Sequence, residues 1–194
     1  MDISTETLKA LRDRTGVSVM QCKKALEEAG GNVEQAEVIL RKRSGAAADK
    51  KADRDLGAGA VATYLHGGEI GSLVLLSSET DFVARNEEFS ALARDIAMQV
   101  AATNPTFLST EEIPEEVRAS AVAVFQEEVK DKPEEMREKI LEGKISAYFR
   151  DQVLLEQTYI KDESKTVRDL ITEASQKFGE RVEITRFARF SARG

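Results

Sequence analysis

Apolar residues in the first 45 positions recur at spacings of about three to five, the period of amphipathic helices. They form three short stretches, and a residue suited to capping a helix precedes each one: Ser4, Ser18 and Asn32. Glycine follows the first two stretches, at Gly16 and Gly30, as is typical where helices end. The sequence therefore predicts a compact bundle of three capped helices. Because a bundle of this length is only marginally stable alone, we expect a small recognition module.

Further along, the period changes to the alternation of β-strands. Residues 60–66 and 70–76 are rich in aliphatic side chains and flank a glycine-containing turn at 67–69, which predicts a β-hairpin. Residues 181–190 also alternate and predict a strand that adds to this hairpin.

Three other regions return to helical spacing. Residues 87–103 predict one helix with a continuous apolar face. Two more helical stretches, joined by a turn near Pro133, predict an antiparallel helical hairpin over about residues 114–155. A last helix is expected from Thr166 to near Phe178.

These elements predict an α+β protein: an N-terminal three-helix bundle, then a three-stranded antiparallel sheet packed with helices and a projecting helical hairpin. Residues 44–58 lack large apolar side chains apart from Leu56 and resemble a helical extension that grades into a linker. We therefore expect a helical head over 1–45, a linker over 46–58 and an α+β core over 59–194.

The composition fits a soluble, folded protein. Hydrophobic residues make up 41% of the 194 residues and charged residues 32%, which disfavours wholesale disorder. No apolar run approaches about 18 residues, so no membrane span is expected. The N-terminus shows no secretory signal, and the single cysteine, Cys22, fits a reducing compartment, so we expect a cytoplasmic protein.

The net charge of −7 is unevenly distributed, with +1 in residues 1–55 and −8 in residues 56–194. An acidic body argues against a broad nucleic-acid footprint, so no direct nucleic-acid partner is expected. A basic stretch stands out between Arg41 and Arg54. We interpret it as a solvated helix end favoured by the helix dipole, with an RNA contact as the alternative.

The sequence offers little catalytic chemistry. No phosphate-binding loop and no His/Cys ligand spacing occur, so neither a cofactor nor a metal is expected. The only histidine, His66, is interpreted as a solvated residue at a strand end rather than a catalyst. Cys22 has no nearby histidine and is interpreted as a packing residue. We therefore expect no catalytic residues and a protein that is not an enzyme.

The most informative segment is the junction between the predicted hairpin and the helix at 87–103, where Asp81 and Phe82 lie side by side. Side chains at such junctions often carry function because a rigid scaffold presents them outward. Two interpretations are open from spacing alone. Phe82 either enters a pocket of another protein, or it packs beneath a helix that Thr80 or Asp81 caps.

Two segments resemble the elongation factor Ts family. Residues 11–26, which read LRDRTGVSVMQCKKAL, resemble its N-terminal signature, and residues 79–85, which read ETDFVAR, resemble its second signature. Further similarity runs through residues 95–102 and 164–167. The resemblance covers nearly the whole chain, and the two signatures occur in the family's order.

The resemblance implies a guanine-nucleotide exchange factor for the translational GTPase elongation factor Tu. In this family an Asp-Phe pair enters beside the GTPase's nucleotide site and displaces its magnesium ion, which promotes GDP release. The motif corresponds without gaps to Thr80, Asp81, Phe82 and Val83. These four residues are therefore the expected partner-binding site.

The family also implies a ubiquitin-associated-like head that docks on the GTPase's nucleotide domain. We expect Val19, Met20 and Lys23 to contribute contacts there. The alternative function is a ubiquitin-associated-like peptide-binding or scaffold module without exchange activity, for which Phe82 would be dispensable. An RNA-associated translation protein that uses the basic stretch is a further alternative.

The chain has room for one sheet-containing unit and resembles the short form of the family, in which two copies pair. A homodimer is therefore expected. The apolar residues of the terminal strand would supply the pairing surface, unless they face the chain's own helices: Val182, Ile184, Phe187 and Phe190.

Overall fold

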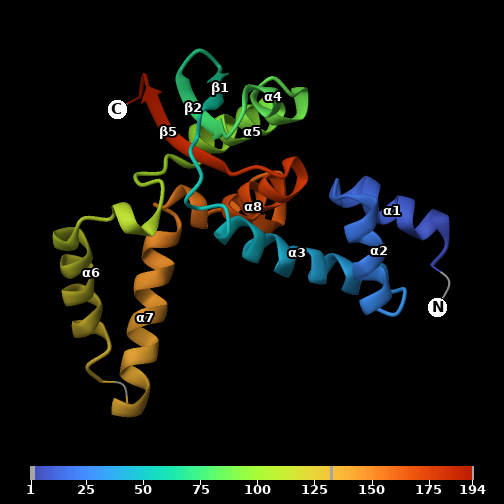
Figure 1. Cartoon of the computed structure of the whole chain (residues 1–194). Coiled ribbons are helices and arrows are strands. Elements are labelled where there is room, and N and C mark those ends of the chain that lie inside the picture. The colour runs from blue at the N-terminus through green and yellow to red at the C-terminus, as the bar shows by residue number, and fades with distance from the viewer. Residues whose placement is uncertain (1–2, 132, 194) are drawn as a thin grey trace. The chain divides into compact units, whose positions relative to one another are not determined.

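The computed structural model describes residues 3–131 and 133–193, including their side chains except at residues 46–49 (Figure 1). Helices combine with a three-stranded antiparallel sheet, which confirms the predicted α+β class. The chain divides into two compact units, each assembled from three segments. Unit 1 comprises Met1–Ala62, Leu75–Ala93 and Asp169–Thr185, and unit 2 comprises Thr63–Val74, Arg94–Arg168 and Arg186–Gly194.

Unit 1 begins with three helices, α1 (Thr5–Thr15), α2 (Val19–Glu28) and α3 (Val33–Asp49). They confirm the three predicted helices, and α3 continues into the segment for which the sequence predicts a helical extension. Cys22 is fully buried among them, in agreement with its interpretation as a packing residue. Their core consists of Leu11, Val17, Cys22, Ala25, Leu26, Ala29, Ala36 and Leu40.

The three helices start where the sequence predicts their caps. The capping oxygens of Ser4, Ser18 and Asn32 accept hydrogen bonds from backbone amides three residues on, at 3.0, 3.4 and 2.9 Å. Each bond satisfies an amide that has no partner within the helix. Gly16 ends α1 in the left-handed conformation, with φ of +66°. Local sequence chemistry therefore sets the boundaries of these helices.

The sheet contains β1 (Ala58–His66), β2 (Ile70–Ser78) and β5 (Val182–Ser191), in the order β1-β2-β5. This confirms the predicted hairpin and the predicted terminal strand. Each of the three strands passes from one unit into the other.

The expectation that the terminal strand supplies the pairing surface is wrong for two of its residues. Val182 and Ile184 are buried and belong to the chain's own core. They are therefore not available to a second copy, because alternate side chains of a strand point to opposite faces and these two point inward. Phe190, near the end of the same strand, is 70% exposed.

The other helices that belong wholly or partly to unit 1 lie between β2 and β5 in the sequence. The short helix α4 (Asp81–Ala84) follows β2, and α5 (Glu87–Thr103) begins in unit 1 and confirms the helix predicted over 87–103. The last helix is α8 (Val167–Phe178). The ring of Phe89 on α5 meets the ring of Phe178 edge to face at 5.8 Å, which joins the two helices.

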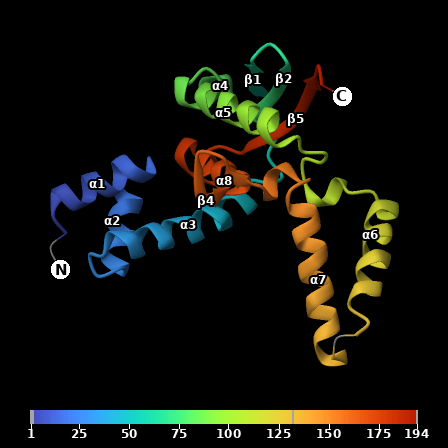
Figure 2. The same ribbon diagram turned by 180° about the vertical axis from the view of Figure 1, so that it is seen from behind.

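Unit 2 contains the predicted helical hairpin, formed by α6 (Glu115–Glu128) and α7 (Glu134–Arg150). The two helices lie side by side in both views (Figures 1 and 2). Pro114 occupies the position before α6 and Pro133 the position before α7, where a missing amide proton costs no hydrogen bond. The buried cluster in this part of unit 2 consists of Ile113, Ala121, Phe149 and Val153.

Unit 2 also contains a small antiparallel pair that the sequence analysis missed, β3 (Thr158–Tyr159) and β4 (Asp162–Thr166). One strand has two residues and the other reads DESKT, so neither shows apolar alternation. Short 3₁₀ helices occur at Thr110–Glu112 and Leu154–Glu156.

Candidate functional site

The expected partner-binding motif lies at the turn between β2 and α5, within unit 1. β2 ends at Ser78, and α4 begins three residues later, at Asp81. The amide of Arg85 donates to the carbonyl of Asp81, and the amide of Asn86 donates to the carbonyl of Val83, both at 3.0 Å. These bonds close a single helical turn that presents its side chains in fixed directions.

Phe82 and Val83 differ strongly in solvent exposure. Phe82 is 83% exposed, whereas Val83 is 4% exposed and packs inside the protein. The interpretation in which Phe82 packs beneath its own helix is therefore wrong in this structure. Consecutive helical residues point about 100° apart, so a single turn buries one of them and presents the other. Here the inward position belongs to Val83.

Thr80 occupies the N-cap position of α4, yet its side chain does not cap the helix. Instead, the carboxylate of Glu180 accepts two hydrogen bonds from Thr80, one from its amide at 3.0 Å and one from its hydroxyl at 2.5 Å. The alternative in which the Thr80 side chain caps this helix is therefore wrong in this structure: the hydroxyl donates to Glu180 and accepts no backbone amide of α4. Glu180 did not emerge from the sequence, since it lies 100 residues from Thr80.

Glu79, just before the motif, accepts hydrogen bonds from two arginine residues. Its Oε1 atom accepts a hydrogen bond from the amide of Arg181 at 2.5 Å, and Arg54 donates to the same oxygen at 3.0 Å. The Arg181 amide bond, assisted by the Arg54 guanidinium, lowers the pKa of the Glu79 carboxyl below its usual value. Arg181 also donates to the carbonyl of Arg54 at 2.6 Å. Arg54, Glu79 and Arg181 are therefore each bonded to the other two, and these bonds hold the chain just before the turn.

Asp81 keeps its carboxylate in solvent. It forms an ion pair with Arg85 one helical turn on, with 3.1 Å between Oδ2 and the guanidinium, and both side chains are largely exposed. Such exposed pairs stabilise a fold little, so the pair leaves the carboxylate available to another charged group.

The expected head residues lie in the first turns of α2. Val19, Met20 and Lys23 are all exposed, and Met20 reaches 69% exposure. Positions three and four apart share a face of a helix, so Lys23 lies beside both Val19 and Met20. A further exposed aliphatic side chain, Val38 on α3, lies on the side of that helix away from the core residues Ala36 and Leu40.

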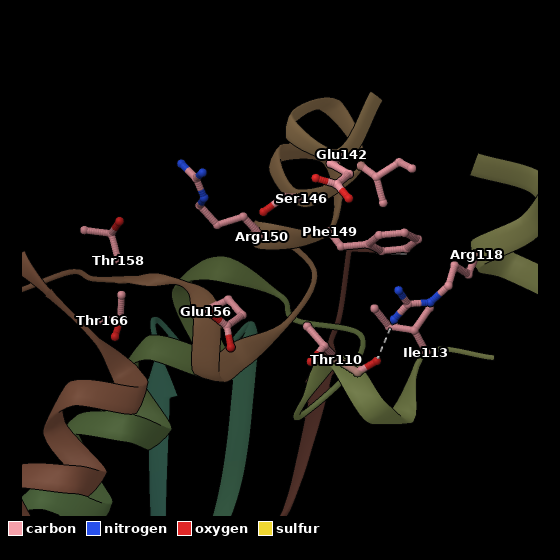
Figure 3. A pocket seen from close by; sticks show the side chains of 11 residues that line it. Thr110, Ile113, Arg118, Glu142, Ser146, Phe149, Arg150, Glu156, Thr158 and Thr166 are labelled. Carbon is pink, nitrogen blue, oxygen red and sulfur yellow. Dashed lines mark hydrogen bonds between the residues drawn. The ribbon is translucent and has the colours of Figure 1, made fainter. Parts of the chain in front are cut away.

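A cavity of about 690 Å³ opens in unit 2 beside α7 (Figure 3). Phe149 lines it together with Glu142, Arg150 and Glu156, and the guanidinium of Arg118 donates to the carbonyl of Thr110 at 3.3 Å. None of its lining residues is a histidine or a cysteine. It therefore offers mixed charges around an aromatic side chain rather than a nucleophile with its base.

The described part of the chain, residues 3–131 and 133–193, shows neither a metal cluster nor a membrane-spanning helix. In it, no cluster of three or more His, Cys, Asp or Glu side chains is arranged to hold a metal ion. Nor does any helix in that part combine the length and apolarity that crossing a membrane requires. His66 is exposed at the end of β1, and its Nδ1 atom lies 3.3 Å from the Tyr64 hydroxyl.

Comparison with known proteins identifies the family. The model of a family described as elongation factor TS matches residues 48–193. A protein named elongation factor Ts from Thermosipho melanesiensis is 48% identical over 192 residues, which cover 97% of this chain and 98% of the relative. Another from Thermodesulfovibrio yellowstonii is 46% identical over 191 residues, covering 98% and 96%. The chain therefore belongs to the elongation factor Ts family of translation elongation factors.

Proposed function

We propose that this protein is the guanine-nucleotide exchange factor of elongation factor Tu and promotes GDP release in the cytoplasm during polypeptide elongation. The observation that carries the proposal is the 83% exposure of Phe82 on a turn that hydrogen bonds hold in place. A large aromatic side chain that is ordered but unburied is typical of an interface anchor.

The turn supplies both parts of the expected action. Phe82 enters a pocket of the GTPase, and its burial there contributes about 2–3 kcal/mol. Asp81 brings a carboxylate toward the magnesium ion that bridges the phosphates of bound GDP. Disturbing that coordination weakens nucleotide binding without a covalent step, so the protein needs no catalytic residue. Because coupling between two ligands is reciprocal, returning nucleotide also weakens the factor's own binding, and the factor leaves.

Within the four-residue motif we assign two different roles. Asp81 and Phe82, both exposed, contact the partner. Thr80 and Val83 hold the turn, Thr80 through Glu180 and Val83 through its burial. Val19, Met20 and Lys23 form a second contact on the head, where exposed apolar side chains lie beside a positive charge.

The test is the release of fluorescent GDP from purified elongation factor Tu at substoichiometric factor. The native chain should accelerate release, and a folded Phe82→Ala variant should lose most of the acceleration. Met136→Ala is the matched control because Met136 is also an exposed apolar residue, on α7. Absence of acceleration by the native chain would refute the exchange function and favour the peptide-binding head. Full activity of Phe82→Ala would refute the assignment of Phe82.

We also propose that two copies pair through exposed apolar residues of unit 2. Leu65 on β1, Leu73 on β2 and Phe190 on β5 are exposed although all three lie on strands of the sheet. Covering them would remove apolar surface from water, which favours association. Light scattering should give a dimer for the native chain and a monomer for Leu65→Lys. Val124→Lys, which places the same charge on exposed α6, should leave the mass unchanged.

A further inference from the structure

We propose that Glu180 is a positioning residue for exchange: its carboxylate holds Thr80 and thereby fixes the turn that presents Asp81 and Phe82. This inference rests on the proposed exchange function and adds to it a residue outside the motif. Glu180 lies in the corner between α8 and β5, and both it and Thr80 belong to unit 1.

Both carboxylate oxygens of Glu180 bind Thr80, so the contact is bidentate. Glu180 Oε2 accepts the amide of Thr80 at 3.0 Å, while Oε1 accepts the hydroxyl at 2.5 Å. Two bonds to a backbone group and a side-chain group of one residue fix its position and also its rotation. Gly179, which has φ of +75°, lies directly before Glu180 and turns the chain after α8.

Apart from Glu180, one other side chain bonds to Thr80: the hydroxyl of Ser78 donates to its carbonyl at 3.0 Å. α4 has four residues, which is far fewer than an isolated helix needs, and no side chain caps it. Phe82 is exposed and contributes little to packing. Val83 is the buried residue of α4 and anchors it to the core. Without Glu180, the turn would sample other conformations, and the partner would have to order it on binding.

The same corner holds the preceding residue. Arg181, next to Glu180, donates its amide to Glu79, next to Thr80. Consecutive residues of the corner thus bind consecutive residues at the start of the turn. The arrangement clamps the backbone of the turn on one side and leaves Asp81 and Phe82 unobstructed.

The first test compares GDP release from elongation factor Tu for three variants across a range of factor concentrations. Loss of both acceptor oxygens in Glu180→Ala should lower the exchange efficiency about tenfold, mainly through a higher half-saturating concentration. Glu180→Gln should recover part of this loss, because its amide group can still accept one bond and donate another. Glu128→Gln is the matched control: it weakens an ion pair with Lys144 in the helical hairpin, away from the corner and the turn, and it should behave as the native chain.

A second measurement separates positioning from a general effect on the fold. In the Phe82→Ala background, adding Glu180→Ala should lower exchange less than about twofold, since both substitutions disable the same turn. Amide hydrogen exchange should show that Thr80 loses protection in Glu180→Ala while the amides of α5 keep theirs. Thermal unfolding of Glu180→Ala should stay within a few degrees of the native chain.

The possible failures are distinguishable. If the native chain does not accelerate GDP release, the exchange function and this inference both fall. If the native chain is active and Phe82→Ala is not, but Glu180→Ala matches the native chain, only the role of Glu180 is refuted. An equal loss from Glu180→Ala with and without Phe82 would also refute it, because Glu180 would then act elsewhere.

Discussion

Phe82 and Val83 are consecutive residues of α4, yet the first is exposed to solvent and the second is buried in the core of unit 1. The pair places a group available to a partner directly beside the group that anchors it. Stability and partner binding should therefore respond to different members of the same motif.

Val83→Ala should lower the free energy of unfolding by about 1–3 kcal/mol, because it removes buried methyl groups and leaves a cavity. Phe82→Ala should change it by less than about 0.5 kcal/mol, since an exposed side chain contributes little packing. Urea unfolding of both variants checks this contrast. A large loss of stability in Phe82→Ala would show that the ring is covered in solution.

Gln99 on α5 is a buried polar residue on which unit 2 depends. Its amide group donates to Oε1 of Gln157 and to the carbonyl of Thr158, both at 3.1 Å, and its oxygen accepts the amide of Ile160 at 2.9 Å. Gln99→Leu removes the partners of the Thr158 carbonyl and the Ile160 amide, whereas Gln157 Oε1 keeps the Thr103 hydroxyl at 2.7 Å, and it should cost about 1–3 kcal/mol of unfolding free energy. The control is Gln126→Leu on exposed α6, which should be nearly neutral. Similar effects of the two substitutions in urea unfolding would contradict the prediction.

Glu79 should make stability sensitive to acid. Its pKa is lowered in the folded chain by the Arg181 amide and by Arg54, so the unfolded chain takes up the proton first as the pH falls. The contribution of Glu79 is therefore complete above its unfolded value, near 4.5, and is lost as the pH falls through the lower folded value. Thermal unfolding of native and Glu79→Gln chains between neutral pH and pH 3 tests this: the native advantage should shrink below about pH 4.5. A constant difference at every pH would contradict it.

Tyr159 should make stability sensitive to alkaline pH. It is buried, and its hydroxyl donates to Asp95 at 2.8 Å; burial, with this contact, raises its pKa above the ordinary value of 10.0. The folded chain holds the proton more tightly than the unfolded chain, so stability is complete below pH 10 and falls as the pH rises above it.

Tyr159→Phe removes both the hydrogen bond and the titrating group. At neutral pH it should cost about 0.5–1.5 kcal/mol, and above pH 10 the native chain should lose stability faster than the variant. Chemical unfolding at pH 7, 9 and 10.5 measures both effects. Tyr148→Phe, which alters a half-exposed tyrosine on α7, serves as the control. Parallel pH profiles for native and Tyr159→Phe chains would refute the role of Tyr159.

Much of the fold could be predicted from the sequence because its causes are local. The caps at Ser4, Ser18 and Asn32 define helix starts within three residues, and the apolar period over 87–103 predicts α5 with its observed bounds. The β1–β2 hairpin follows from two alternating segments around a glycine turn. The β3–β4 pair could not be found in this way, because its strands are short and polar and depend on tertiary neighbours such as Gln99.

For the candidate site, local sequence patterns were enough to single out the residues: Thr80 to Val83 lie at a strand-to-helix junction, and the motif matches its family without gaps. The exposure of Phe82, the burial of Val83 and the bond between Glu180 and Thr80, 100 residues apart, could be seen only in the folded chain. The reason is physical. Capping and periodicity act between near neighbours along the chain, whereas burial and long-range hydrogen bonds depend on which distant segments the folded chain brings together.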